Sequence, residues 1–204
     1  MIETVTYYLA LVTLVTVPAT LVAWLLLHPL APTWRRMGTV GAFALISAVV
    51  MAVMLGMYYV REPLLSVRFD VKMPLVVVSG ILFGISSFIN ALVYRQAPHS
   101  MVFGLAELSE GNPGRLVTGG IYARVRHPRF VAMFLAVLSI AMFTNVLAVY
   151  VIAVIYIPVI LLVALLEDRE LAARFGPLYD EYAKEVPRFL PRPAKQGTHG
   201  KSAT

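Results

Sequence analysis

The sequence predicts an all-α integral membrane protein with five transmembrane helices, the last two forming a hairpin, followed by amphipathic helices at the membrane surface. Its composition is the first observation. Of the 204 residues, 59% are apolar and only 14% are charged, whereas a soluble domain carries about 25% charged residues. The second observation is that the apolar residues are collected in four long blocks, each long enough to cross a hydrocarbon core of about 30 Å.

The first three blocks cover residues 4–27, 38–60 and 74–94, and each predicts one transmembrane helix. The first block could be mistaken for a cleaved signal peptide. However, it lacks a basic start, because Glu3 is its only early charge, and its apolar run is too long. We therefore expect it to remain as a span.

The fourth block, residues 129–166, is too long for one straight span, because its helix would extend about 57 Å. The polar pair Thr144-Asn145 is the break inside it. Two antiparallel spans are therefore expected, about 129–143 and 146–166, of which the first is short. Both ends of this hairpin then return to the same membrane face.

The character of the chain changes after residue 166. Gly176 can end the helix that continues from the last span, and Pro177 suits the first position of another. Apolar side chains recur there at helical spacing and predict amphipathic surface helices: Leu171, Phe175, Leu178, Tyr179, Tyr182 and Val186. We expect residues 1–193 to form a single domain and the polar residues 194–204 to be a disordered tail.

Charge and residue counts exclude several classes of function. The net charge of +6 comes from basic residues in membrane-flanking loops and the tail. This indicates topology and anionic headgroups, so no nucleic-acid partner is expected. The chain has no cysteine, which excludes disulfides and thiolate catalysis. None of the four histidines forms a pair at metal-ligand spacing, so no metal site is expected.

The stretch RVRHPRF, residues 124–130, places charge at the start of a membrane helix. Because His127 precedes a proline it should be extended, and Pro128 should begin the helix. Arg126 and His127 would then lie at a helix N-terminus, where an anionic group is held well. The other end of the hairpin carries acidic residues, Glu167, Asp168 and Glu170. We expect the two clusters to face each other across one gap that suits a zwitterionic ligand.

The sequence LVTGGIYARVRHPRF (116–130), the hairpin with Asn145 at its turn, and EDRELAARFGPLYDEYAKEVPRFLP (167–191) together resemble the isoprenylcysteine carboxyl methyltransferase family. The wider set includes membrane phospholipid methyltransferases. The resemblance covers roughly residues 115–191 and depends on the ordered set of motifs. It implies an all-helical membrane enzyme whose S-adenosylmethionine pocket lies between the last hairpin and the C-terminal segment, on the cytoplasmic side of a multi-pass protein.

The resemblance also implies roles for individual residues. The Arg-His-Pro motif falls on residues 126–128 and the acidic pair on 167–168. The residues that we expect to bind the cofactor are Arg126, His127, Glu167 and Asp168, with Tyr122 and Tyr182 as walls of the pocket. Phe130 and Glu107 are candidates for substrate contact. Three features depart from the family: Asp168 replaces a glutamate, Phe130 lacks a hydroxyl, and residues 163–168 contain no arginine, which weakens the case for a prenylcysteine substrate.

The methyl acceptor is expected to be lipidic, because the first three spans offer an apolar approach from the bilayer. It is either an isoprenylcysteine-like carboxylate, which needs no base, or a phospholipid amine, which must lose a proton. For an amine, Glu107, Glu110 or His99 in the long loop could serve as the base.

Two other functions remain open from the sequence. Membrane sterol or lipid reductases share a similar C-terminal pattern and bind NADPH. A non-catalytic membrane scaffold or transporter subunit is the other alternative. Transport would favour ionisable residues within the spans, and the first three spans have almost none.

Overall fold

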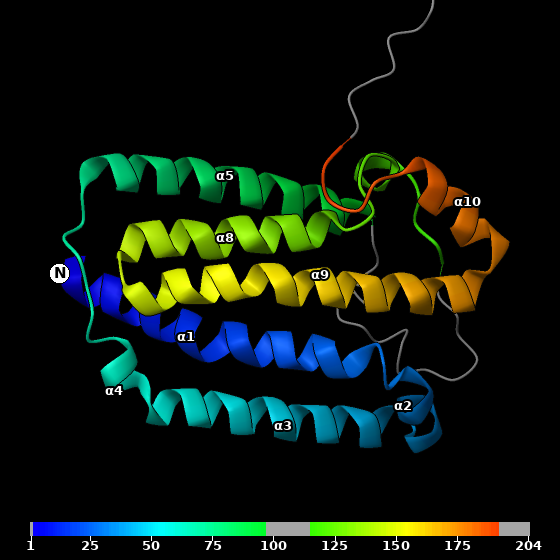
Figure 1. Ribbon diagram of the computed structural model, residues 1–204, viewed down its shortest axis with the longest axis horizontal. Helices are drawn as coiled ribbons and strands as arrows, with labels where there is room; N and C mark the ends of the chain where they lie inside the picture. The colour runs from blue at the N-terminus through cyan, green and yellow to red at the C-terminus, as the bar shows by residue number, and fades with distance from the viewer. Residues whose placement is uncertain (1, 97–114, 192–204) are drawn as a thin grey trace, which may run out of the picture.

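The computed structural model describes residues 2–96 and 115–191. Five long helices lie side by side in it (Figure 1). They are α1 (Ile2–Leu27), α3 (Thr39–Tyr59), α5 (Met73–Gln96), α8 (Pro128–Thr144) and α9 (Leu147–Phe175). The all-α membrane fold predicted from the sequence is confirmed, and the helices follow the predicted apolar blocks closely.

The shorter helices gather at the two ends of the bundle (Figure 1). α2 (Ala31–Met37), the 3-10 helix η1 (Gly120–Ala123) and α10 (Pro177–Glu185) lie near the end where α8 begins, whereas α4 (Arg61–Leu64) lies at the opposite end. The predicted disordered tail, 194–204, and the loop candidates His99, Glu107 and Glu110 fall outside the described residues.

The long helices pack in an order that differs from their order in the chain. α1 contacts α3, α8 and α9, α9 also packs against α8, and α5 packs against α8 (Figure 1). Trp24 of α1, Phe130 of α8 and Tyr156 of α9 meet in the main apolar cluster. On the outer helix α3, Ala42 alone is buried. α1, α8 and α9 therefore form the packed centre, while α3 and α5 present apolar side chains outward, as a bilayer requires.

Within the described part of the chain, four helices are long and apolar enough to cross a membrane, namely α1, α3, α5 and α9. The fifth long helix, α8, has 17 residues. At about 1.5 Å per residue it extends about 26 Å, slightly less than a hydrocarbon core of about 30 Å. The count of five spans therefore stays a prediction.

The turn between α8 and α9 falls at the predicted Thr144-Asn145 break. Asn145 adopts a left-handed conformation with φ of +50°, which asparagine tolerates better than most residues. Its side-chain amide donates to the Asp70 carbonyl at 2.7 Å, and its own carbonyl accepts from the Phe69 N–H at 2.9 Å. The short helix α8 thus reaches the loop that precedes α5, which fixes the position of the hairpin.

The end of α9 also follows the local signals in the sequence. α9 continues without a break to Phe175, Gly176 takes a φ of +56°, and α10 begins at Pro177. The chain therefore reverses at Gly176 and brings α10 back beside α9. Leu178 on α10 is 68% exposed, whereas Tyr179 is only 2% exposed because it turns inward toward α9.

Candidate active site

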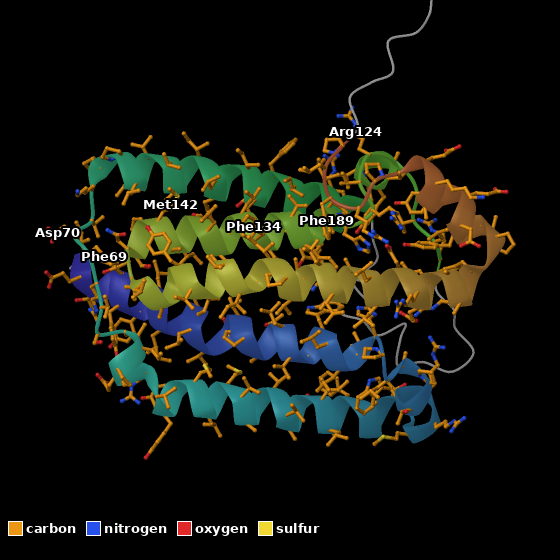
Figure 2. All side chains as sticks on the ribbon, viewed as in Figure 1. Phe69, Asp70, Arg124, Phe134, Met142 and Phe189 are labelled. Atoms are coloured by element: carbon orange, nitrogen blue, oxygen red, sulfur yellow. The ribbon has the colours of Figure 1, made fainter. Side chains whose placement is uncertain are left out.

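Polar side chains gather at the end of the bundle where α8 begins and the apolar part of α9 ends. Figure 2 labels Phe189 beside the start of α8, far from Phe69 and Asp70 at the opposite end. His127 lies outside the helical region, with φ of −120° and ψ of 58°, and Pro128 starts α8. The helix start at Pro128 was predicted from the His-Pro sequence, whereas His127 is not fully extended as expected. The imidazole therefore lies at the mouth of the hairpin, opposite the last turns of α9.

The carboxylate of Asp168 is the centre of this cluster. Its Oδ1 atom lies 2.9 Å from His127 Nε2 and 3.0 Å from Arg126 Nη1, and it accepts a hydrogen bond from the Tyr179 hydroxyl. Its Oδ2 atom accepts from Arg188 Nε at 2.6 Å. Four donors from three separate segments thus converge on one carboxylate, which therefore holds the site together and has little capacity left for a ligand.

The C-terminal segment closes over the start of α8 through its backbone. The N–H of Arg126 donates to the Pro187 carbonyl at 2.9 Å, and the N–H of His127 donates to the Arg188 carbonyl at 2.9 Å. The Tyr182 hydroxyl donates to the Tyr122 carbonyl at 2.7 Å. These bonds fix the backbone of the Arg-His pair, so its side chains are held in one arrangement.

Glu167 differs from its neighbour Asp168. Its Oε2 atom lies 3.3 Å from His127 Nδ1, which is an ion-pair distance. Oε2 is buried and has no hydrogen-bond partner among the described residues. The Nε atom of Arg126 is also buried and has no hydrogen-bond partner within residues 2–96 and 115–191. Buried polar atoms without partners are costly unless a ligand satisfies them, so this pair fits a bound molecule that offers both donors and acceptors.

His127 carries a positive charge at neutral pH. Burial by itself lowers the pKa of the imidazole, but the carboxylates of Glu167 and Asp168 beside it outweigh that effect and raise it to about 9. The ring also stacks on Phe130, with centroids 5.4 Å apart and planes 15° apart. A protonated imidazole held between two carboxylates can orient charged groups but cannot accept a proton.

The tyrosines around the cluster are hydrogen-bond donors and not bases. Burial raises the pKa of Tyr122 to about 12, and burial likewise raises the pKa values of Tyr179 and Tyr182. Their hydroxyls stay protonated at neutral pH. They can shape the site and donate hydrogen bonds, but they do not supply a general base.

The third acidic residue lies elsewhere, which corrects the expected grouping of Glu167, Asp168 and Glu170. Glu170 Oε2 is 3.3 Å from His28 Nδ1, and its Oε1 is 3.1 Å from Arg35 Nη2. The reason is helical geometry: two residues along an α-helix rotate the side chain by about 200°. Glu170 therefore faces α1 and α2, while Asp168 faces α8 and α10.

The structure brings together the six residues that were predicted to bind the cofactor. Arg126, His127, Glu167 and Asp168 are in contact, and Tyr182 joins Tyr122 at the edge of the cluster. Phe130 is 3% exposed and packs between the His127 ring and the edge of Trp24. This placement gives Phe130 a packing role. The other substrate candidate, Glu107, lies outside the described residues.

Sequence reasoning missed Arg188 as a member of this site. The residue contacts Asp168 from 20 positions further along the chain, with no spacing pattern that links the two. The signal that could have identified it is the Val-Pro-Arg stretch, residues 186–188, directly after the last helix. Pro187 restricts the backbone next to Arg188, so this basic side chain can form an ion pair with an acidic residue on α9.

Comparison with known proteins identifies the family. A model of the phospholipid methyltransferase family matches residues 74–177, just over half of the chain. The chain belongs to this family. The match runs from α5 through the Arg-His-Pro motif to the start of α10, so it includes the Arg126–His127 pair and both carboxylates of Glu167 and Asp168.

One curated relative is the cobalt-zinc-cadmium resistance protein CzcN of Cupriavidus metallidurans, which is 33% identical over 131 residues. The alignment covers 57% of this chain and 59% of the relative. The chain thus spans about three-fifths of the length of that protein. No solved structure matches. The sequence resemblance to the wider set of membrane methyltransferases is therefore confirmed at the level of the family.

Proposed function

We propose that this protein transfers a methyl group from S-adenosylmethionine to a lipidic acceptor in the membrane, at a site built from Arg126, His127 and Glu167. The observation that carries the proposal is the buried Oε2 of Glu167, which has no hydrogen-bond partner among the described residues and lies 3.3 Å from His127 Nδ1. In a chain of a methyltransferase family, a carboxylate oxygen without a hydrogen-bond partner, beside the protonated imidazole of His127, suits a cofactor that carries hydroxyl, amino and carboxylate groups.

The residues present fit that cofactor. Glu167 can accept hydrogen bonds from ribose hydroxyls or from an amino group, while Arg126 and protonated His127 can hold a carboxylate. When bound, S-adenosylmethionine supplies an activated methyl group on a sulfonium, so the protein has only to align the reactants and exclude water. Asp168 is a positioning residue, because it holds the arginine and the imidazole in place.

The charge state of the site bears on the acceptor. His127 is already protonated at neutral pH and the tyrosines keep their protons, so the proton acceptors of the described cluster are its two carboxylates. The proposal assigns Glu167 to the cofactor and Asp168 to positioning, which leaves neither for an amine. A carboxylate acceptor, such as an isoprenylcysteine-like lipid, needs no proton acceptor. For a phospholipid amine, the base is assigned to the loop residues His99, Glu107 or Glu110. In either case the acceptor approaches from the bilayer, and the site faces the cytoplasm, where the cofactor is made.

Cofactor binding tests the proposal without a known acceptor. Purified full-length protein is titrated by calorimetry with S-adenosylhomocysteine and, separately, with NADPH. We expect S-adenosylhomocysteine to bind and Glu167→Gln to weaken it about tenfold or more, which is about 1.4 kcal/mol. The matched control is Glu181→Gln, because Glu181 is exposed on α10, and it should bind normally. Binding of NADPH alone would replace the methyltransferase with a membrane reductase.

The acceptor is then sought directly. Protein is incubated with methyl-labelled S-adenosylmethionine and a membrane lipid extract, and the labelled products are separated by chromatography. Base-stable label on a phospholipid headgroup identifies an amine, whereas base-labile label identifies a carboxyl ester. Label recovered only in water-soluble products contradicts a lipidic acceptor.

A further inference from the structure

A hollow lies on the other side of α9 from the candidate active site. Its volume is about 320 Å³, and its walls come from the connection between α1 and α2 and from the last turns of α9. The polar residues that line it are His28, Arg35, Arg169, Glu170 and Arg174. None of them belongs to the cluster around Asp168, so the hollow needs an explanation of its own.

Cations outnumber anions in this hollow. Glu170 is the single carboxylate of the lining, and both of its oxygens are engaged: Oε1 by Arg35 and Arg174, and Oε2 by His28 at 3.3 Å. Three guanidinium groups against one carboxylate leave a net charge of at least +2 on the lining. A single ion pair of Glu170 would be enough to hold α9 against α2. The structural role of Glu170 therefore does not account for the excess of positive charge in the hollow.

Arg169 and Arg35 can both reach a ligand in the hollow. Arg169 is exposed and makes no ion pair with any described residue. The Arg35 side chain keeps 32% of its surface exposed although it contacts Glu170. A guanidinium carries five donors in a planar fork that matches the oxygens of a phosphate. Two such forks at one opening form a site for a tetrahedral anion.

The hollow lies at the depth of lipid phosphates. The apolar part of α9, from Leu147 to Leu166, is about 20 residues and extends about 30 Å, the thickness of the hydrocarbon core. Leu166 lines the hollow, and Arg169 follows one turn later. Trp24 stacks on His28 with centroids 5.5 Å apart, and tryptophan is enriched at the membrane interface. The cations therefore lie where headgroups lie.

We propose that this hollow binds the phosphate group of an anionic lipid headgroup, held by Arg35 and Arg169 and supported by Arg174 and His28. Basic pockets between membrane helices recognise headgroups through such charge-assisted hydrogen bonds. The site goes beyond methyl transfer and uses none of the residues assigned to the cofactor. Its success or failure is therefore independent of the proposed activity.

Binding of matched lipids tests this site. Purified full-length protein is measured by native mass spectrometry with phosphatidylglycerol and with a diacylglycerol of the same acyl chains, which lacks the phosphate. We expect phosphatidylglycerol to bind and Arg169→Gln and Arg35→Gln each to weaken it about tenfold, or about 1.4 kcal/mol. The matched control is Arg36→Gln, because Arg36 is the exposed neighbour of Arg35 and does not line the hollow. It should change binding by less than about twofold.

Comparison of the variants and competition with inorganic phosphate decide between the possible outcomes of this experiment. Equal weakening by all three variants would show general surface charge and overturn the site, as would equal binding of diacylglycerol. If Arg35→Gln lowers the unfolding temperature, Arg169→Gln decides, since it leaves the Glu170 ion pairs intact. Competition by inorganic phosphate with the same Arg169 dependence identifies the phosphate group alone as the ligand, whereas its failure to compete assigns the site to the lipid. S-adenosylhomocysteine binding should persist in Arg169→Gln, which separates this site from the cofactor site.

Discussion

At the scale of single residues, the two adjacent carboxylates have different tasks. The sequence presents Glu167 and Asp168 as one acidic pair, and nothing in their spacing separates them. In the structure Asp168 is surrounded by Arg126, His127, Tyr179 and Arg188, whereas Glu167 keeps a buried oxygen for a ligand. The difference arises from contacts with the C-terminal segment, which are distant in sequence and carry no periodic signal.

Replacement of the central carboxylate should destabilise the fold. Asp168→Asn removes the negative charge and leaves the Arg126 side chain, which is only 9% exposed, without its counter-ion. Loss of one member of a buried ion pair costs about 3–5 kcal/mol. We expect a loss of that order in equilibrium unfolding in mixed micelles. Asp180→Asn, at an exposed position of α10, is the control and should change stability by less than about 0.5 kcal/mol. An equal effect of both substitutions would remove Asp168 from its central role.

The raised pKa of His127 makes stability depend on pH. The pKa is about 9 in the folded protein against an ordinary value of 6.5, so folding favours the protonated ring. The stabilisation is present in full below about pH 6.5 and is lost as the pH rises through about 9. The unfolding temperature of the wild type should therefore fall over this interval. In His127→Gln, which cannot titrate there, this part of the slope should vanish, and an unchanged slope would assign it to another group.

At the scale of elements, local sequence signals were sufficient to predict where α8, α9 and α10 begin or end. Pro128 begins α8, and Asn145 ends α8 at the hairpin turn. Gly176 and Pro177 separate α9 from α10. All three boundaries were predicted. These residues act through their own backbone preferences, which a sequence displays directly. The short helices α2 and α4 were not predicted. α2 depends on the tertiary bond from Trp34 Nε1 to the Leu26 carbonyl, 3.0 Å long, which no local pattern reveals.

The hairpin turn offers a test of how its position is fixed. Asn145→Ala places an alanine at a φ of +50° without the local side-chain hydrogen bonding that lets asparagine tolerate this conformation, which costs up to about 1–2 kcal/mol. It also removes the bond to the Asp70 carbonyl, worth about 1 kcal/mol. We expect a total loss of about 2–3 kcal/mol in equilibrium unfolding. Asn145→Gly tolerates the backbone conformation and should lose only the side-chain part. If both variants lose the same amount, the backbone conformation contributes nothing.

At the scale of the whole molecule, the long helices were predictable but their arrangement was not. Apolar block length gave the limits of the helices, because it depends only on the thickness of the bilayer. The placement of α1 against α8 and α9 depends on complementary packing of side chains such as Trp24 and Phe130. Such complementarity cannot be predicted from the sequence of one helix alone. The packing of α8 against α9 was predictable, because the short turn between them forces the two helices to lie side by side and antiparallel.

Five membrane crossings predict which loops share a side. The chain has no cysteine, so single cysteines can be introduced and labelled with a membrane-impermeant maleimide. Arg124→Cys and Asp180→Cys should be labelled from one side, and Ser66→Cys and Asp70→Cys from the other, since all four positions are exposed. Labelling of all four from the same side would mean that α8 and α5 do not cross the bilayer.

The contacts of the C-terminal segment also set the order in which the protein becomes competent. Arg126 and His127 pair with the carbonyls of Pro187 and Arg188, which are synthesised after all five long helices of the described residues. A chain truncated before residue 187 would therefore contain these helices but would lack both carbonyls and the Arg188 guanidinium, which close the site over Asp168.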